Sequence, residues 1–379
     1  MNKSVRLRRY DIDWLRVLAM LMIFLFHTAR TFDNMDWHIK NKQLDFGMTI
    51  FVNIVAQWIM PLFFMLSAMS AFHALSHRKD KEYIGERFKR LVIPFVFGMF
   101  VLIPPQVYVE RVNHSQFVGS FIEFLPHYFE GLYGFGGNFA WMGLHLWYLG
   151  VLFIFTVLTL PFFRYIQTEA PQNFVGSVAA FLKRPGAIFL SAIPIAVMEI
   201  VVNLQPAGIG RRDFGGWSIL TYLIFFILGY FMASDSQFKE SIERHRVIGL
   251  MAGIITTILS YLWLTSGMSD RHYLFALMRG LMSWSWLVAI LGFGSRYLVS
   301  TNGLLKYANE AVLPFYILHQ TVIVLIGFYV TLWDASVIVK YLAISSTSFV
   351  IIVGLYELLV KRNQALRFLF GMKPGPRVQ

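Results

Sequence analysis

Residues 14–32, WLRVLAMLMIFLFHTARTF, decide the fold class of this chain. The stretch is apolar over nearly its whole length, although it carries Arg16 and His27. About 20 mostly apolar helical residues cross the hydrocarbon core of a bilayer, so we expect a transmembrane helix here. A basic stretch, Lys3 to Arg9, precedes it and no small-residue cleavage site follows. We therefore expect a retained first span and not a cleaved signal peptide.

Nine further segments of the same character predict an all-α, polytopic transmembrane helix bundle of about ten helices. The expected spans are 14–32, 48–75, 91–109, 143–163, 186–204, 217–233, 247–266, 273–294, 311–333 and 335–360. We expect residues 1–363 to form a single transmembrane domain and residues 364–379 a cytoplasmic tail. Within the tail, the short amphipathic piece ALRFLF is expected to lie on the inner membrane surface.

The composition supports the membrane interpretation. Of 379 residues, 57% are hydrophobic and 14% are charged, and the mean hydropathy is +0.58. Soluble domains carry about 25% charged residues, so a soluble chain of this kind would lack polar surface. The chain has no cysteine, which excludes disulfides, thiolate metal sites and a cysteine nucleophile.

The net charge of +12 is explained by the distribution of the basic residues along the chain. With the N-terminus inside, 24 of the 33 Lys and Arg residues fall in the expected cytoplasmic segments and 8 in the outer ones, and Arg279 lies within a span. This bias follows the positive-inside rule, and an even number of spans places both termini in the cytoplasm. No nucleic-acid partner is predicted.

The outer segment 110–142 is rich in aromatic residues and glycine, as in FLPHYFEGLYGFGGNFAWMG (124–143). Aromatic faces with polar rims suit sugars, so this segment is one candidate for a substrate-facing platform. An interfacial aromatic belt explains the same composition, and the sequence does not separate the two interpretations.

Ionisable residues inside spans are functional candidates, because lipid penalises their charge. Arg16 and His27 are eleven positions apart, which places them on one helix face within about 20° and about 16 Å apart along the axis. Asp13 falls on the same stripe. A buried histidine that only packs and hydrogen-bonds is the alternative.

Two arginines in ERFKRLVIP (86–94) precede the expected third span. Arg87 and Arg90 are three residues apart and so share a helix face. We expect them at a helix N-terminus, where the backbone dipole also favours a phosphate. The alternative is that they only provide the positive-inside signal.

Other polar residues in the expected spans are His145, Glu199, Arg279 and His319. Glu199 and Arg279 are expected to pair, since pairing lowers the free-energy cost of burying either charge. The chain contains no HExxH, P-loop or GxSxG pattern, so it lacks the signatures of zinc proteases, nucleotide hydrolases and serine hydrolases. No metal site is predicted.

The stretch YDIDWLRVLAMLMIFLFH (10–27) resembles the opening helix of the type-three membrane acyltransferase family. The hallmark of that family is an arginine, ten residues and a histidine, which Arg16 and His27 match, with Asp13 three residues earlier. PLFFMLSAMS (61–70) and the arginines before Pro94 resemble its second block.

The resemblance continues through HLWYLGVL, VLPFYILHQ and the C-terminal LYELLVKRNQALRFLFGMKPGPR. These features and DWHIKN (36–41) look most like the branch that succinylates osmoregulated periplasmic glucans. One departure is Ser67-Ala68-Met69, where the family usually has Ser-Gly-Phe or Ser-Gly-Tyr. Because alanine retains much of the close helix approach that glycine allows, the fold is expected to be unaffected.

The resemblance implies a multi-pass enzyme of the bacterial inner membrane. It would move an acyl group, succinyl in preference to acetyl, from cytoplasmic acyl-CoA to a hydroxyl of an extracytoplasmic carbohydrate such as osmoregulated periplasmic glucan. Succinyl-CoA or acetyl-CoA would be the donor substrate, and no permanently bound cofactor is implied. The oligomeric state is left open.

The resemblance and the polar positions together assign candidate roles. The catalytic group is His27 with Asp13 and Arg16, where His27 is either a general base or a transient acyl carrier. Arg16, Arg87 and Arg90 would bind the CoA phosphates. The candidate substrate-binding residues are His38, His145, Trp147, Glu199, Arg279 and His319, with a structural role favoured for His319.

Two other functions are kept open. One is O-acetylation of a surface polysaccharide by the same kind of enzyme. The other is a proton-coupled transporter without acyl transfer, because intramembrane His, Arg and Glu also suit carriers. Carriers commonly show inverted repeats, and no such repeat is visible in this sequence.

Overall fold

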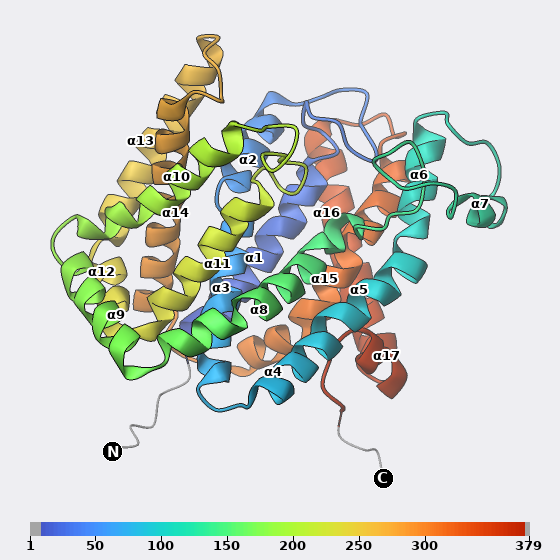
Figure 1. The fold of residues 1–379 in the computed structure, drawn as a ribbon. Coiled ribbons are helices and arrows are strands. Elements are labelled where there is room, and N and C mark those ends of the chain that lie inside the picture. Colours follow the sequence, from blue (N-terminus) through green and yellow to red (C-terminus); the bar gives the residue numbers. More distant parts are fainter. Residues whose placement is uncertain (1–8, 376–379) are drawn as a thin grey trace. The chain divides into compact units, whose positions relative to one another are not determined.

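The structure is a computed structural model that describes residues 9–375 (Figure 1). Most of these residues are helical, and within this range no strand forms. A single isolated bridge pairs Leu132 with Phe139. The expected all-helical fold is confirmed.

Most helices follow one another with short connections, and three longer segments, 30–45, 128–143 and 204–218, lie between helices. The first part of the chain forms α1 (Tyr10–Ala29), α2 (Phe46–Ala56), α3 (Ile59–Leu75), α4 (Asp80–Arg87), the π-helix η1 (Phe88–Val92), α5 (Ile93–Phe97), the π-helix η2 (Gly98–Leu102), α6 (Pro104–Asn113), α7 (Phe121–His127), the 3-10 helix η3 (Leu144–Leu146), α8 (Trp147–Ile166) and α9 (Glu169–Leu182). The remainder forms the 3-10 helix η4 (Ala187–Ser191), α10 (Ala192–Asn203), α11 (Ile219–Ser234), α12 (Ser236–Arg244), α13 (Arg246–Thr265), α14 (Tyr273–Tyr297), α15 (Gly303–Val330), α16 (Val337–Leu355), the π-helix η5 (Tyr356–Val360) and α17 (Gln364–Leu369).

Seven helical stretches in the described part of the chain are long and apolar enough to cross a membrane. The number rises to nine if two bent pairs each count as one span: Asp80–Leu102 with Pro104–Asn113, bent by 42°, and Ile219–Ser234 with Ser236–Arg244, bent by 105°. Ala187–Asn203 is a shorter apolar helix. Each expected span contains a helix, and the multi-pass character is supported. The count of ten and the cytoplasmic termini remain predictions.

Short polar side chains define where several helices begin. The side chains of Ser218, Asp235, Ser336 and Asn363 accept hydrogen bonds from the first backbone N–H groups of α11, α12, α16 and α17. These N–H groups have no partner within the helix, so a capping oxygen stabilises the start by about 1 kcal/mol.

The chain divides into two compact units, each assembled from separate stretches. Unit 1 consists of the chain up to Ala19 with Ala56–Asp80 and Leu158–Asn309, and unit 2 of Met20–Val55, Lys81–Val157 and the chain from Glu310 onward. Helices α1, α8 and α15 contribute several residues to both units, and α2 and α4 contribute one residue each, Ala56 and Asp80, to unit 1.

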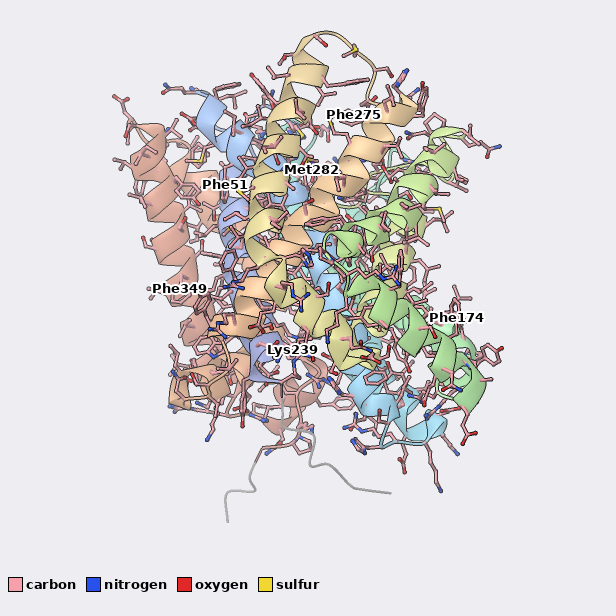
Figure 2. All side chains as sticks on the ribbon, turned by 90° about the vertical axis from the view of Figure 1, so that its left-hand side faces the viewer. Phe51, Phe174, Lys239, Phe275, Met282 and Phe349 are labelled. Carbon is pink, nitrogen blue, oxygen red and sulfur yellow. The ribbon has the colours of Figure 1, made fainter. Side chains whose placement is uncertain are left out.

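Unit 1 is held together by closely packed helix pairs, among them α13 with α14 and α11 with α3. A Cβ atom added at Gly229 on α11 would lie 2.5 Å from the carbonyl oxygen of Met65 on α3, so glycine permits this approach. On α14, Phe275 and Met282 are buried (Figure 2). The Met282 sulfur lies 3.6 Å from the Ser260 hydroxyl of α13.

Unit 2 includes the C-terminal helix α17, which packs beside α5 (Figure 1). The rings of Phe97 and Phe370 are 5.5 Å apart, and the buried Arg367 forms an ion pair with Glu310 at 2.9 Å. Gly371, with φ of +67°, ends this helix, and a Cβ there would lie 2.8 Å from the Arg90 carbonyl oxygen. The first part of the expected tail is thus tightly packed.

Candidate functional site

Three histidines gather in unit 2. The imidazole of His27, near the end of α1, lies 5.1 Å from that of His319 on α15, measured between ring centroids. His145 in η3 lies 5.1 Å from His319, with the two ring planes perpendicular. His145 and His319 are buried, whereas His27 is partly exposed. The structure therefore brings together three residues that the sequence singled out separately.

Backbone carbonyls fix the proton positions on two of these rings. The Nδ1 atom of His319 lies 2.5 Å from the carbonyl oxygen of Tyr316, and Nε2 of His145 lies 3.2 Å from that of Ile317. A carbonyl oxygen only accepts, so each of these nitrogens carries the proton. The other nitrogen of each ring is then a lone-pair acceptor.

The three histidines are not arranged as metal ligands. Among residues 9–375, no group of three or more His, Cys, Asp or Glu side chains is placed to hold a metal ion. An imidazole in such a cluster can donate or accept hydrogen bonds, move a proton or act as a nucleophile.

Trp37 and His38 lie in the loop after α1. The Trp37 ring stacks near His27, with ring centroids 6.1 Å apart and an interplanar angle of 20°. The centroids of Trp37 and its neighbour His38 are 5.4 Å apart. The loop is braced by Lys40, whose Nζ donates to the Asp33 carboxylate at 2.5 Å. Burial lowers the pKa of Lys40, and the Asp33 carboxylate opposes this effect.

His38 forms a buried pair with Glu110 on α6. Nδ1 of His38 donates to a Glu110 carboxylate oxygen. The same carboxylate accepts from the Tyr133 hydroxyl at 2.9 Å and from Arg111 at 3.0 Å. Burial and the nearby Glu110 carboxylate raise the pKa of Tyr133, so its phenol keeps the proton that it donates.

A chain of side-chain amides extends this pair. The Gln320 amide donates to His38 Nε2 at 3.0 Å and to Gln106 Oε1 at 3.1 Å. Gln106 in turn donates to the Thr321 hydroxyl at 2.7 Å. All these side chains are buried, so the network ties the loop that carries Trp37 to α6 and α15.

A second buried polar cluster lies in unit 1, around Glu199 of α10. Its carboxylate accepts from Arg279 at 2.8 Å, from Arg212 at 3.0 Å and from the Thr221 hydroxyl at 2.7 Å. The predicted pairing of Glu199 with Arg279 is confirmed. The Arg279 guanidinium also lies 3.9 Å above the ring of Trp217, which is within range of a cation–π interaction.

Arg16 lies on α1 within unit 1. It donates to the Ser70 hydroxyl of α3 at 2.7 Å and pairs with Asp13 at 3.5 Å. Asp13 and Arg16 are therefore close, as their spacing on one helix predicts. No described contact tests their assignment to catalysis or to CoA.

The expectation that Arg87 and Arg90 lie at a helix N-terminus is wrong. The helical run begins at Asp80 and continues through Leu102, so both arginines lie well inside it and the N-terminal dipole does not act on them. Arg87 is half-buried with its guanidinium 5.2 Å from the centre of the Tyr83 ring, and Arg90 is exposed. Their charge and exposure still suit an anion.

Sequence reasoning missed several residues that the structure places in these clusters. Glu110 and Tyr133 escaped attention because charged and aromatic residues are ordinary at span ends and in loops. Arg212 lies in the segment between two expected spans, 205–216, where a basic residue is equally ordinary. Trp147, a predicted substrate-binding residue, is buried at the start of α8 with its ring 6.5 Å from Tyr148.

The model of an acyltransferase family, Acyl_transf_3, described as "Acyltransferase domain", matches residues 9–357. The chain belongs to this family. It is therefore an enzyme that transfers acyl groups, and its many apolar helices make it a multi-pass membrane acyltransferase.

The acyltransferase is also similar to curated proteins over most of its length. Proteins named "Glucans biosynthesis protein C" from Salmonella paratyphi A, Salmonella agona and Salmonella dublin are each 25% identical to it over 378 residues. The similarity covers 97% of this chain and 95% of each relative. No solved structure matches it significantly.

Proposed function

We propose that the acyltransferase moves a succinyl group from cytoplasmic succinyl-CoA to a hydroxyl of an extracytoplasmic carbohydrate, such as an osmoregulated periplasmic glucan, in the bacterial inner membrane. The name of its relatives supports a glucan as acceptor. The observation that carries the proposal is the position of His27, which is partly exposed although its neighbours His145 and His319 are buried.

His27 is proposed to act as the general base. A neutral imidazole takes the proton of the acceptor hydroxyl while the oxygen attacks the thioester carbonyl carbon. The tetrahedral intermediate collapses as the carbon–sulfur bond breaks, and the imidazolium returns the proton to the leaving thiolate. The products are the acyl ester and free CoA, and no other reactant is required.

On the donor side, Arg87 and Arg90 are proposed to contact the CoA phosphates. A guanidinium forms paired, charge-assisted hydrogen bonds with phosphate oxygens. Arg16 remains a separate candidate for phosphate binding, because it lies about 16 Å from His27 along the axis of α1. That distance suits the extended pantetheine arm.

On the acceptor side, the proposal assigns binding to the loop that carries Trp37 and His38. The Trp37 ring is next to His27, and aromatic faces are suited to pack against sugar rings. Glu199 and Arg279 are hydrogen-bonded to each other within unit 1. This pairing favours a structural role for both residues over substrate binding.

Membership of an acyltransferase family favours the enzyme over the proton-coupled transporter. O-acetylation of a surface polysaccharide keeps the same chemistry with another donor and acceptor. Mass spectrometry of the envelope glycans from a strain lacking the protein separates these substrates, because a lost succinyl group and a lost acetyl group differ in mass.

The decisive variant is His27→Ala. We expect it to lower kcat for acyl transfer by about 10²–10⁴-fold, which is the usual contribution of a general base. The measurement is CoA release by the purified enzyme with succinyl-CoA and glucan. His77→Ala is the control, because this histidine is exposed in the turn between α3 and α4.

An unchanged rate in folded His27→Ala would remove His27 from the reaction. Incubating the wild-type enzyme with radiolabelled succinyl-CoA in the absence of glucan tests the other route. Label retained on His27 would show an acyl-histidine intermediate and would replace direct transfer by a two-step mechanism.

A further inference from the structure

His319 presents a fixed lone pair next to His27. Its Nδ1–H is held by the Tyr316 carbonyl oxygen at 2.5 Å, so its Nε2 can only accept a hydrogen bond. Tyr316 is itself anchored, since its hydroxyl donates to the carbonyl oxygen of His145. The orientation of the His319 ring is therefore set by its own helix and by η3.

His27 and His319 each have one buried ring nitrogen without a hydrogen-bond partner among the described residues. These atoms are Nδ1 of His27 and Nε2 of His319. The two ring centroids are 5.1 Å apart and the planes are inclined by 50°. The two nitrogens are not hydrogen-bonded to each other in the structure. Since unsatisfied buried polar atoms cost free energy, a rotation of the His27 ring that brings these atoms within bonding distance would satisfy both.

Such a bond requires a particular tautomer of His27. His319 Nε2 has no proton to give, so His27 must carry its proton on Nδ1. We infer that His319 is a positioning residue: after that rotation its Nε2 accepts from His27 Nδ1–H and leaves the Nε2 lone pair of His27 free to act as the base. The inference rests on the proposed function of His27.

The proton balance of the reaction agrees with this assignment. When His27 Nε2 takes the hydroxyl proton, the ring becomes an imidazolium with a proton on each nitrogen. Its Nδ1–H bond to His319 then becomes charge-assisted and stronger. No proton passes to His319, which acts on the tautomer and orientation of the base as the aspartate does in serine-protease triads.

Among the side chains around His27, His319 is the one placed to accept a hydrogen bond from its Nδ1–H. His145 contacts His319 and Tyr316, and Trp37, which stacks near His27, can only donate a hydrogen bond through its indole N–H. The titratable groups that act electrostatically on His27 are His319, His145, His38 and Arg30. Of these, His319 combines a ring contact with His27 and a lone pair fixed by a carbonyl.

The tautomer of His27 can be measured without any substrate. In the enzyme labelled with ¹⁵N-histidine, NMR distinguishes protonated from bare ring nitrogens, and the His27→Asn variant identifies the His27 signals by subtraction. We expect Nδ1–H on His27 in the wild type. In His319→Leu we expect a loss of this tautomer. His245→Leu serves as the control for loss of a buried imidazole outside the cluster, because His245 is buried in unit 1 with its own hydrogen-bond partners.

The same substitutions are tested by steady-state kinetics of acyl transfer. We expect His319→Leu to lower kcat about 10- to 100-fold, part of the general-base contribution, with KM for succinyl-CoA unchanged. His319→Gln should recover most of the rate, because its amide oxygen can accept from His27 Nδ1–H. A merely structural role predicts no selective recovery by glutamine and no change of tautomer.

The outcomes separate this inference from the proposed function. Nε2–H on His27 in the wild-type enzyme would overturn the inference even if His319→Leu failed to fold, and it would leave His27 as a candidate catalyst. An unchanged kcat in folded His319→Leu would overturn it as well. Activity retained by His27→Ala would instead overturn the proposed function, whatever the tautomer.

Discussion

At the scale of single residues, the Glu110 carboxylate concentrates the polar interactions of unit 2. It is buried and accepts hydrogen bonds from His38, Arg111 and Tyr133. Glu110→Gln keeps the size of the side chain but removes the charge and places an N–H group among these donors. We expect it to lower the free energy of unfolding by about 1–3 kcal/mol, measured by denaturation of the purified protein in detergent.

Glu130→Gln is the matched control for this prediction. Its carboxylate is exposed and pairs with the exposed His127 at 2.9 Å, so we expect a change within about 0.5 kcal/mol. Equal effects of the two substitutions would show that the buried network does not stabilise the fold.

The sequence indicated single residues better than it indicated their partners. His27 and Glu199 could be found because a polar residue in an apolar helix is unusual. Glu110 and Tyr133 are 23 positions apart, and both stand where polar residues are ordinary, so their contact could not be foreseen. The tautomer of His319 is set by the Tyr316 carbonyl oxygen in the preceding turn. The sequence does not show which ring nitrogen faces that oxygen, so the tautomer could not be predicted from it.

At the scale of elements, the contact of α11 with α3 depends on Gly229. A Cβ there would lie 2.5 Å from the Met65 backbone, which cannot move aside as a flexible side chain can. We expect Gly229→Ala to destabilise the protein by about 1–3 kcal/mol. The measurement is thermal unfolding in detergent, compared with Gly176→Ala.

Gly176 is the control because it lies inside α9 with nothing within 4 Å of an added Cβ. Alanine there should be neutral or stabilising by up to about 1 kcal/mol. If Gly229→Ala changed the stability no more than Gly176→Ala does, the close approach of α11 and α3 would not contribute to stability.

The positions of helices followed from hydropathy, whereas their internal breaks did not. All ten expected segments are helical because long apolar runs in lipid must satisfy their own backbone. The bend of 42° comes where Pro104 removes a backbone N–H, and the helix before Arg87 begins earlier than expected, at Asp80. Apolarity alone could not predict that polar start, because Asp80–Arg87 is largely charged.

At the scale of the whole molecule, the short helix Ala187–Asn203 decides the topology. If it crosses the membrane, the ten expected segments all span and both termini share one side. If it does not, the number of spans is odd and the termini lie on opposite sides. The lack of cysteine in the native chain makes single-cysteine variants clean reporters of this difference.

We expect Asn173→Cys, before this helix, to be protected from a membrane-impermeant maleimide in right-side-out vesicles, and Ala207→Cys, after it, to be labelled. Both positions are exposed, so both should react once detergent dissolves the membrane. Lys306→Cys marks the expected inner side and Phe135→Cys the outer side. Labelling of Asn173→Cys and Ala207→Cys from the same side would mean that Ala187–Asn203 does not cross, and it would place one terminus outside. Because the positive-inside bias was counted on ten crossings, that result would also require the basic segments to be reassigned from Ala187 onward.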